Sequence, residues 1–110
     1  MIDWSRVKGF DWDAGNARKS ADKHDVTQSE AEQVFFGQTL LIAPDDRHSE
    51  REARWHALGQ TLDERFLHVS FTLREQGTLI RVISARPMHR KERRHYAKAQ
   101  QAATGIQDRG

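Results

Sequence analysis

Cysteine is absent from the 110-residue chain, which excludes disulfide bonds, thiolate metal sites and a cysteine nucleophile. Long apolar runs are absent too, since no stretch approaches the roughly 20 residues that a membrane-spanning helix needs. Residues 1–5 lack the apolar core of a signal peptide. The mean hydropathy is −0.86. These features favour a soluble protein, which we expect in the cytoplasm and away from membranes.

The motifs of several enzyme classes are also missing. The six histidines show neither His-x-His nor His-x-x-x-His spacing, and no cysteine is present to complete a metal site. No glycine-rich loop follows an expected strand, and no Gly-x-Ser-x-Gly elbow occurs. We therefore expect a protein without a metal ion or a cofactor.

Length and composition allow one modest hydrophobic core. A chain of 110 residues with 36% hydrophobic side chains has room for one domain and not for two. We expect a single domain over residues 1–110, folded from about residue 5 to residue 103, with a C-terminal tail at 104–110.

The net charge of +2 hides an uneven distribution. Residues 1–50 carry a net charge of −4 and residues 51–110 a net charge of +6. Between Arg81 and Lys98 there are seven lysines and arginines and a single acid, Glu92. Such a cluster is typical of a surface that binds a polyanion, although a solvated helix face would have the same composition.

The clearest secondary-structure pattern begins at residue 78. Alternation over residues 78–86 predicts a strand, with Arg86 on one face and Arg81 on the other. Pro87 ends this strand because proline has no N–H to donate to a neighbour. A basic helix is expected over about 88–103, and its thin apolar stripe predicts loose docking in the absence of a partner.

The remaining elements follow from caps, turns and alternation. Thr27 and Glu30 have the spacing of a capping box, which predicts a helix that Gly37 terminates. The other expected elements are strands at 7–12, 39–43 and 66–73, a weak helix at 13–23, a strand or helical turn at 54–59, and a hairpin turn at 75–77. Together these predict an α+β domain, with a small antiparallel sheet, two N-terminal helices and one C-terminal helix.

Arginines on strands, with histidine and tyrosine nearby, suit metal-free cleavage of RNA. In that reaction the 2′-hydroxyl loses a proton and attacks phosphorus, and the protein supplies proton carriers and cations. A guanidinium binds two phosphate oxygens at once, whereas an imidazole or a phenol can transfer a proton. The candidates are Arg65, Arg81 and Arg86 for the phosphate and His24 or Tyr96 for the protons.

Each candidate also has a structural interpretation. Arg86 could form an ion pair, Arg65 could be an ordinary surface residue at the start of a strand, and His24 could cap a helix C-terminus. Tyr96 could pack in the core with its hydroxyl at the rim. The residues alone leave these alternatives open.

Several segments, taken in order, resemble the BrnT family of type II toxins. The most specific segment is Ile80–Arg86 (IRVISAR), followed by Glu92–Tyr96 (ERRHY). The resemblance covers about residues 8–98. The other matching segments are Phe10–Asp13, Asp22–His24, Ser29–Phe35, Arg54–Trp55 with Gly59, and Arg65.

This resemblance implies a RelE-like fold and a metal-independent endoribonuclease toxin that blocks translation. It also implies a BrnA-like antitoxin with a ribbon-helix-helix part, so that promoter DNA is contacted only through the antitoxin complex. The residues that match the family's recurrent polar positions are His24, Arg54, Arg65, Arg81, Arg86 and Tyr96. Together with Arg54, we expect the helical arginines Arg90, Arg93 and Arg94 to bind the RNA backbone.

One departure from the family pattern lies beside a candidate residue. Asp25 follows Lys23-His24 where the family usually has glycine, although aspartate also tolerates a left-handed backbone. A carboxylate at this position could change the proton affinity of His24 or repel RNA. A second hypothesis is a non-catalytic protein that binds a DNA-binding antitoxin and supports repression.

Overall fold

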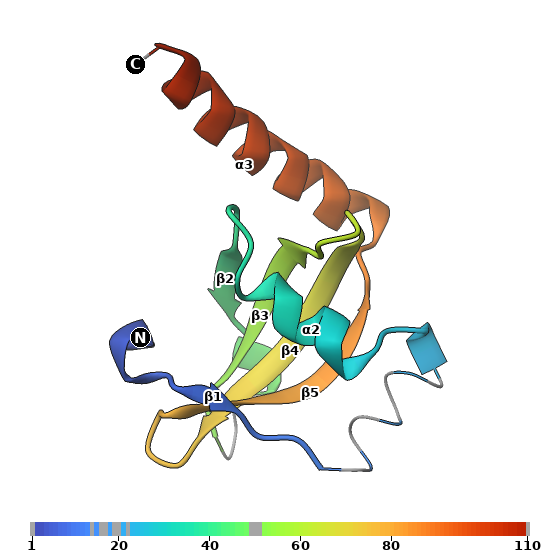
Figure 1. Cartoon of the computed structure of the whole chain (residues 1–110), viewed down its shortest axis with the longest axis vertical. Coiled ribbons are helices and arrows are strands. Elements are labelled where there is room, and N and C mark those ends of the chain that lie inside the picture. The colour runs from blue at the N-terminus through green and yellow to red at the C-terminus, as the bar shows by residue number, and fades with distance from the viewer. Residues whose placement is uncertain are drawn as a thin grey trace.

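The computed structural model describes residues 2–109 apart from 14, 16, 17, 19, 20, 22 and 49–51. A five-stranded sheet forms its centre, with one helix against a face of the sheet and another at one end (Figure 1). The elements in chain order are the 3-10 helix η1 (Trp4–Arg6), β1 (Gly9–Phe10), α2 (Gln28–Val34), β2 (Leu41–Pro44), the 3-10 helix η2 (Asp46–His48), β3 (Arg54–Gln60), β4 (Phe66–Arg74), β5 (Leu79–Pro87) and α3 (Arg90–Arg109).

The sheet is mixed, and the expectation of a purely antiparallel sheet is wrong. Its strand order is β1-β5-β4-β3-β2, and β2 to β5 form an antiparallel meander. β1 instead pairs parallel with β5, with Phe10 opposite Ile80. Between β1 and β2 the chain crosses one face of the sheet through α2. Because β1 and β5 are far apart in the sequence and no hairpin joins them, they can pair in parallel.

The core lies between α2 and one face of the sheet. Ala31 and Val34 of α2 are fully buried against β3 and β4, where Phe71 is also fully buried. Phe35 contacts the edge of Phe71 with ring centroids 5.1 Å apart. The opposite face has no such covering among the described residues, and its polar side chains form the candidate site.

Local signals at the start of α2 are confirmed. Thr27 accepts the backbone N–H of Glu30, and the Glu30 carboxylate accepts the backbone N–H of Thr27, which completes the capping box. Asp25 has φ +53°, a left-handed backbone that aspartate tolerates.

The expected pair of N-terminal helices does not match the structure, in which α2 is the one N-terminal helix with defined bounds. The other was expected over 13–23, and this segment lies largely outside the described residues. Gly15, Arg18, Ala21 and Lys23 of this segment are described and are helical, although a glycine and alanines give a helix there little intrinsic stability.

A β-bulge in β5 changes which side chains share a face. Ser70 pairs with Ser84 but Phe71 pairs with Val82, so Ile83 is an extra residue in the ladder. The alternation shifts at this point. Arg81 pairs with Thr72 and Arg86 with His68, and positions 68 and 72 lie on one face of β4. Arg81 and Arg86 therefore share a face, contrary to the expectation from simple alternation.

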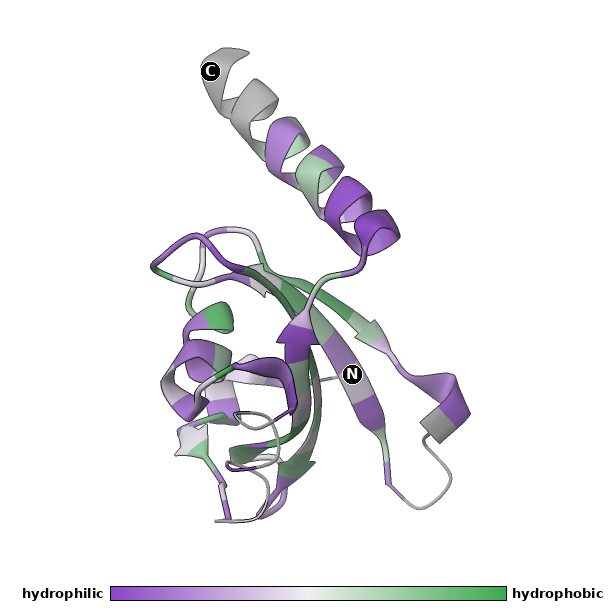
Figure 2. Ribbon diagram, turned by 90° about the vertical axis from the view of Figure 1, so that its right-hand side faces the viewer, coloured by the Kyte–Doolittle hydropathy of each residue, from purple (hydrophilic) through white to green (hydrophobic). Residues whose placement is uncertain are grey.

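Helix α3 leaves the end of the sheet and projects away from it (Figure 2). It begins at Arg90 and continues to Arg109, beyond the end expected at residue 103. Besides Glu92, which bonds Arg86 at the end of β5, three side chains hold it to the sheet and its loops. Arg93 lies over the ring of Phe66, the hydroxyl of Tyr96 donates to the carbonyl oxygen of Thr39, and Gln100 bonds Gln60. Among the described residues, no helix combines the length and the apolar character needed to cross a bilayer.

We expect Gly59→Ala to destabilise the domain by about 1–3 kcal/mol, because a core without space must be deformed to accept a methyl group. That methyl group would lie 2.6 Å from Cγ1 and 3.0 Å from the backbone oxygen of Val34. Urea unfolding measures the loss. Gly9→Ala is the control, since its methyl group would lie 3.6 Å from Leu79, an ordinary contact. Equal stabilities for the two variants would contradict this packing.

Hydrogen exchange tests how firmly α3 is docked. We expect amides beyond Gln100 to exchange much faster than those of β4, because no described side chain beyond Gln100 bonds the sheet. Amides around Tyr96 should be intermediate, because Tyr96 is 1% exposed and bonded to Thr39. Slow exchange along the whole helix in the free chain would contradict this expectation.

Candidate functional site

The open face of the sheet contains a groove of about 380 Å³ where β3, β4 and β5 meet the first turn of α3. The strand register places its polar residues in rows, with His56 opposite Ser70 and His68 opposite Arg86. Cations, imidazoles and carboxylates therefore face one small volume. The groove is lined by Asp45, Arg54, His56, His68, Ser70, Ile83, Ser84, Arg86 and Glu92.

Two histidines from adjacent strands are in direct contact in this groove. Nδ1 of His56 lies 2.9 Å from Nε2 of His68, and one of these nitrogens must donate a proton to the other. Burial lowers the pKa of His68 to about 4, helped by the positive charge of Arg86. His68 is therefore neutral near pH 7. His56 is the more accessible ring, with 37% of its side chain exposed.

A carboxylate lies on the far side of His56. Oδ2 of Asp45 is 2.8 Å from Nε2 of His56, but the oxygen does not lie along the direction of an Nε2–H bond. The contact is therefore chiefly electrostatic and not a hydrogen bond. This negative charge favours the tautomer of His56 that carries its proton on Nε2. Nδ1 of His56 then accepts a hydrogen bond from the Nε2–H of His68.

Arg86 reaches the groove from the end of β5 and forms a two-pronged ion pair with Glu92. Nη1 and Nη2 of Arg86 donate to the two Glu92 oxygens at 2.8 and 3.0 Å. Glu92 also accepts the backbone N–H of His89, and thus caps α3. Although burial alone would raise the pKa of Glu92, these hydrogen bonds lower it to about 2. Glu92 is ionised at neutral pH.

Of the predicted arginines, Arg54 is the second one in this groove. It lies on β3 opposite Thr72 of β4, on the same face as Arg86. The predicted phosphate ligands Arg54 and Arg86 thus approach the groove from strands on either side of β4, with the two histidines between them.

Arg81 shares the open face but lies elsewhere along it. Like Arg54, it pairs with Thr72, four residues along β4 from the partner of Arg86, but unlike Arg54 it is not among the residues that line the groove. Arg81 forms ion pairs with Asp13 and, at 3.3 Å, with Asp11, both of which follow β1. The structure does not bring Arg81 together with Arg86.

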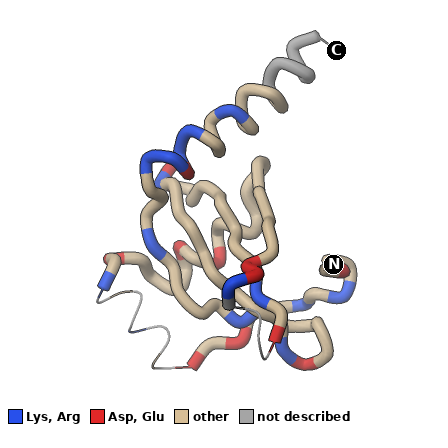
Figure 3. The backbone as a smooth tube through the Cα atoms, turned by 180° about the vertical axis from the view of Figure 1, so that it is seen from behind, with Lys and Arg blue, Asp and Glu red and all other residues tan. Residues whose placement is uncertain are grey.

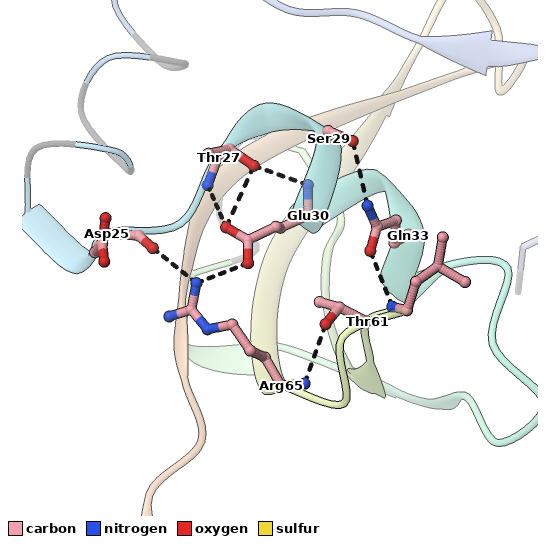
Figure 4. A network of polar contacts seen from close by, with 8 residues as sticks. Asp25, Thr27, Ser29, Glu30, Gln33, Thr61 and Arg65 are labelled. Carbon is pink, nitrogen blue, oxygen red and sulfur yellow. Dashed lines mark hydrogen bonds and ion pairs between the residues drawn. The ribbon is translucent and has the colours of Figure 1, made fainter.

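Arg65 lies on the other side of the sheet, against the start of α2 (Figure 4). Its Nη1 donates to the Glu30 carboxylate and to the carbonyl oxygen of Asp25, both at 2.8 Å. Glu30 is the capping-box residue of α2. Arg65 thus holds the loop before β4 to the cap of α2, and the groove residues are not among its described partners. His24 precedes Asp25 in the same region, away from the groove.

Tyr96 is buried beside a different hollow. It is 1% exposed, its hydroxyl donates to the carbonyl oxygen of Thr39 at 2.6 Å, and burial raises its pKa. This hollow has a volume of about 670 Å³ and also contains the exposed side chains of Phe36 and Leu62. The described geometry suits the packing interpretation of Tyr96 better than proton transfer.

The three helical arginines lie in the first turns of α3, where basic residues gather (Figure 3). Arg90, Arg93 and Arg94 are all exposed and line a shallow surface hollow with Ala97. The guanidinium of Arg93 also stacks over Phe66, 4.4 Å from the ring centre.

Sequence reasoning missed the two groove histidines and their carboxylates. Alternation in β3 and β4 would have placed His56 and His68 on the polar faces of their strands. The next residues, Ala57 and Val69, lie on the core face. The contact between the two histidines depends on strand register, which the sequence does not state. Among the described residues, no group of three or more His, Asp or Glu side chains is arranged to hold a metal ion.

The neutral His68 makes stability depend on pH. Folded His68 binds its proton near pH 4 and unfolded histidine near pH 6.5, so the unfolded state holds more protons in between. We expect the free energy of unfolding to fall as the pH is lowered through this window, by up to about 3 kcal/mol.

Urea midpoints measured from pH 7 to pH 4.5 test this expectation, and over that range Glu92 stays ionised. His68→Gln is the matched variant, and its stability should change less with pH because it has no imidazole to protonate. Parallel pH profiles for the two proteins would contradict a neutral buried His68.

Comparison with known proteins shows the family of the chain. A search of curated proteins finds no match. Residues 12–92 match the family model described as "Ribonuclease toxin, BrnT, of type II toxin-antitoxin system". This span contains β3, β4, β5 and every residue that lines the groove. The chain belongs to the BrnT family of ribonuclease toxins of type II toxin–antitoxin systems.

Proposed function

We propose that the chain is a metal-independent endoribonuclease and that the groove on the open face is its active site. The observation that supports this most directly is the placement of Arg54 and Arg86 on either side of the His56–His68 pair. In a ribonuclease toxin family, such a groove offers two cations for one phosphate and an imidazole for the proton.

The proposed reaction needs no group from outside the chain other than RNA and water. Nδ1 of His56, released from its hydrogen bond with His68, takes the proton of the 2′-hydroxyl, whose oxygen then bonds to the adjacent phosphorus while the P–O5′ bond breaks. Arg54 and Arg86 stabilise the negative charge that develops on the phosphoryl oxygens. The leaving 5′-oxygen takes a proton from water, and the products carry 2′,3′-cyclic phosphate and 5′-hydroxyl ends.

The exposed arginines of α3 extend this proposal to the rest of the substrate. Arg90 and Arg94 would contact RNA phosphates beside the scissile bond, with Arg93 held flat over Phe66. Such contacts fix the position of the strand without selecting a base sequence.

The partner class follows from the family, because a type II toxin is paired with an antitoxin. We propose a BrnA-like antitoxin with a ribbon-helix-helix part, through which the complex would contact promoter DNA. Gel shifts with the operator, using the complex and then the toxin chain alone, test this proposal. Tight specific binding by the toxin chain alone would contradict it.

Cleavage of a single-stranded RNA oligonucleotide by the purified chain tests the site. We expect undiminished activity in EDTA, and losses in kcat/KM of about 10²-fold or more for Arg86→Ala and for His56→Ala. Arg74→Ala is the control, since Arg74 pairs with Glu52 and does not line the groove.

The Arg65→Ala variant tests a sequence-based candidate that lies outside the groove. Loss of its bonds to Glu30 and Asp25 should lower stability while leaving kcat unchanged well below the unfolding temperature. A large fall in kcat for Arg65→Ala, with Arg86→Ala unaffected, would place the active site on the other side of the sheet.

A second candidate function is a non-catalytic partner of a DNA-binding antitoxin. It is favoured by one observation, that Arg65, Arg81 and Arg86 each contact a carboxylate within the chain. The absence of RNA cleavage at micromolar concentrations of the free toxin would support this candidate over the first.

A further inference from the structure

The contact between Arg86 and Glu92 can be understood in two opposite ways. Glu92 could occupy the fork that a phosphate would use and so compete with RNA. Alternatively, it could hold one edge of the guanidinium and present the other edge to the substrate. The hydrogen bonds of Arg86 distinguish these alternatives.

A guanidinium group has five N–H bonds, of which three are used in the structure. Nη1 donates to Glu92 and also to the carbonyl oxygen of Pro87 at 3.0 Å, and Nη2 donates to Glu92. The Nε–H and the second Nη2–H remain, and no described residue accepts a bond from them. These two bonds lie on the same edge of the planar group and form a second fork, which can bind two oxygens of one phosphate.

Glu92 is itself held firmly enough to act as a reference point. It accepts the backbone N–H of His89 at 2.8 Å, which ties the carboxylate to the first turn of α3. The helix is fixed one turn later by Tyr96, which is buried and bonded to Thr39. Glu92 and Arg86 are each 24% exposed, so the pair lies partly out of solvent, where two parallel charged hydrogen bonds restrict rotation.

We propose that Glu92 is a positioning residue, which fixes the Arg86 guanidinium so that its remaining edge binds the scissile phosphate. This inference rests on the proposed function of the groove and adds a residue that does not touch the substrate. Orientation matters because a misplacement of about 1 Å can cost about 10²-fold in rate. Glu92 also lies 3.9 Å from Nε2 of His68, so the same carboxylate contacts the histidine pair.

The test separates positioning from competition and from a loss of stability. Glu92→Gln keeps the size of the side chain but puts an amide N–H₂ against a guanidinium donor, which breaks the two-pronged bond. Cleavage is measured on an RNA oligonucleotide, and binding on the same sequence with 2′-O-methyl groups, which cannot be cleaved. The control is Glu52→Gln, which removes the carboxylate paired with Arg74 outside the groove.

We expect Glu92→Gln to lower kcat about tenfold or more while affinity for the 2′-O-methyl strand stays equal or increases, because a negative charge has been removed. Glu92→Asp should recover part of the rate. If Glu92 acts through Arg86, adding Glu92→Gln to Arg86→Lys should cause no further loss. A helix that had merely come loose would weaken binding and cleavage together. Increased cleavage by Glu92→Gln would show competition and overturn the proposal, as would wild-type kcat or additive losses.

A second measurement decides the inference even if the chain does not cleave RNA. The Nε–H resonance of Arg86 is followed by NMR while inorganic phosphate is added to the wild-type chain and to Glu92→Gln. We expect a saturable shift in the wild type and a much weaker response in the variant. No response in the wild type, or equal responses in both proteins, would overturn the positioning role, whereas absence of cleavage alone would overturn only the proposed function.

Discussion

One extra residue in β5 determines which face of the sheet carries Arg86. In a regular strand, residues five apart point to opposite faces, so Arg81 and Arg86 would be separated by the sheet. The unpaired Ile83 shifts the alternation, which leaves Ala85 in the core and places Arg86 beside His68 on the open face. The groove depends on this shift, because without it Arg86 would lie on the other face of the sheet. Arg86 also connects the groove to α3 through its bonds to Glu92.

A carboxylate partner does not by itself decide whether an arginine binds phosphate. The ion pair of Arg86 with Glu92 is partly buried and uses one edge of the guanidinium, so a phosphodiester can share the group through its other edge. Position is more informative. Arg65 connects two loops behind the sheet and Arg81 holds the segment after β1, whereas Arg86 ends its strand at a groove that also contains His56. Of the arginines predicted in or next to the sheet strands, Arg54 and Arg86 line the groove, whereas Arg65 and Arg81 do not.

The sequence predicted what depends on neighbouring residues and missed what depends on register. The capping box of Thr27 and the β4–β5 hairpin are set by a few adjacent residues, and both were expected. The parallel pairing of β1, the bulge, and the contact of His56 with His68 arise from how distant strands align. The ion pair of Arg81 with Asp11 spans 70 positions, and no local pattern indicates it.

The start of α3 belongs to the site, whereas the rest of the helix does not. Glu92 and Tyr96 anchor the helix at two points about 6 Å apart along its axis, one to the end of β5 and the other to the segment before β2. Two anchors on one face fix both the direction and the rotation of a stiff helix. Arg90 and Arg94 therefore occupy defined positions relative to the groove although neither has to contact the sheet. The positive charge in this part of the sequence is thus carried on an ordered helix surface, where Arg90, Arg93 and Arg94 line one shallow hollow with Ala97.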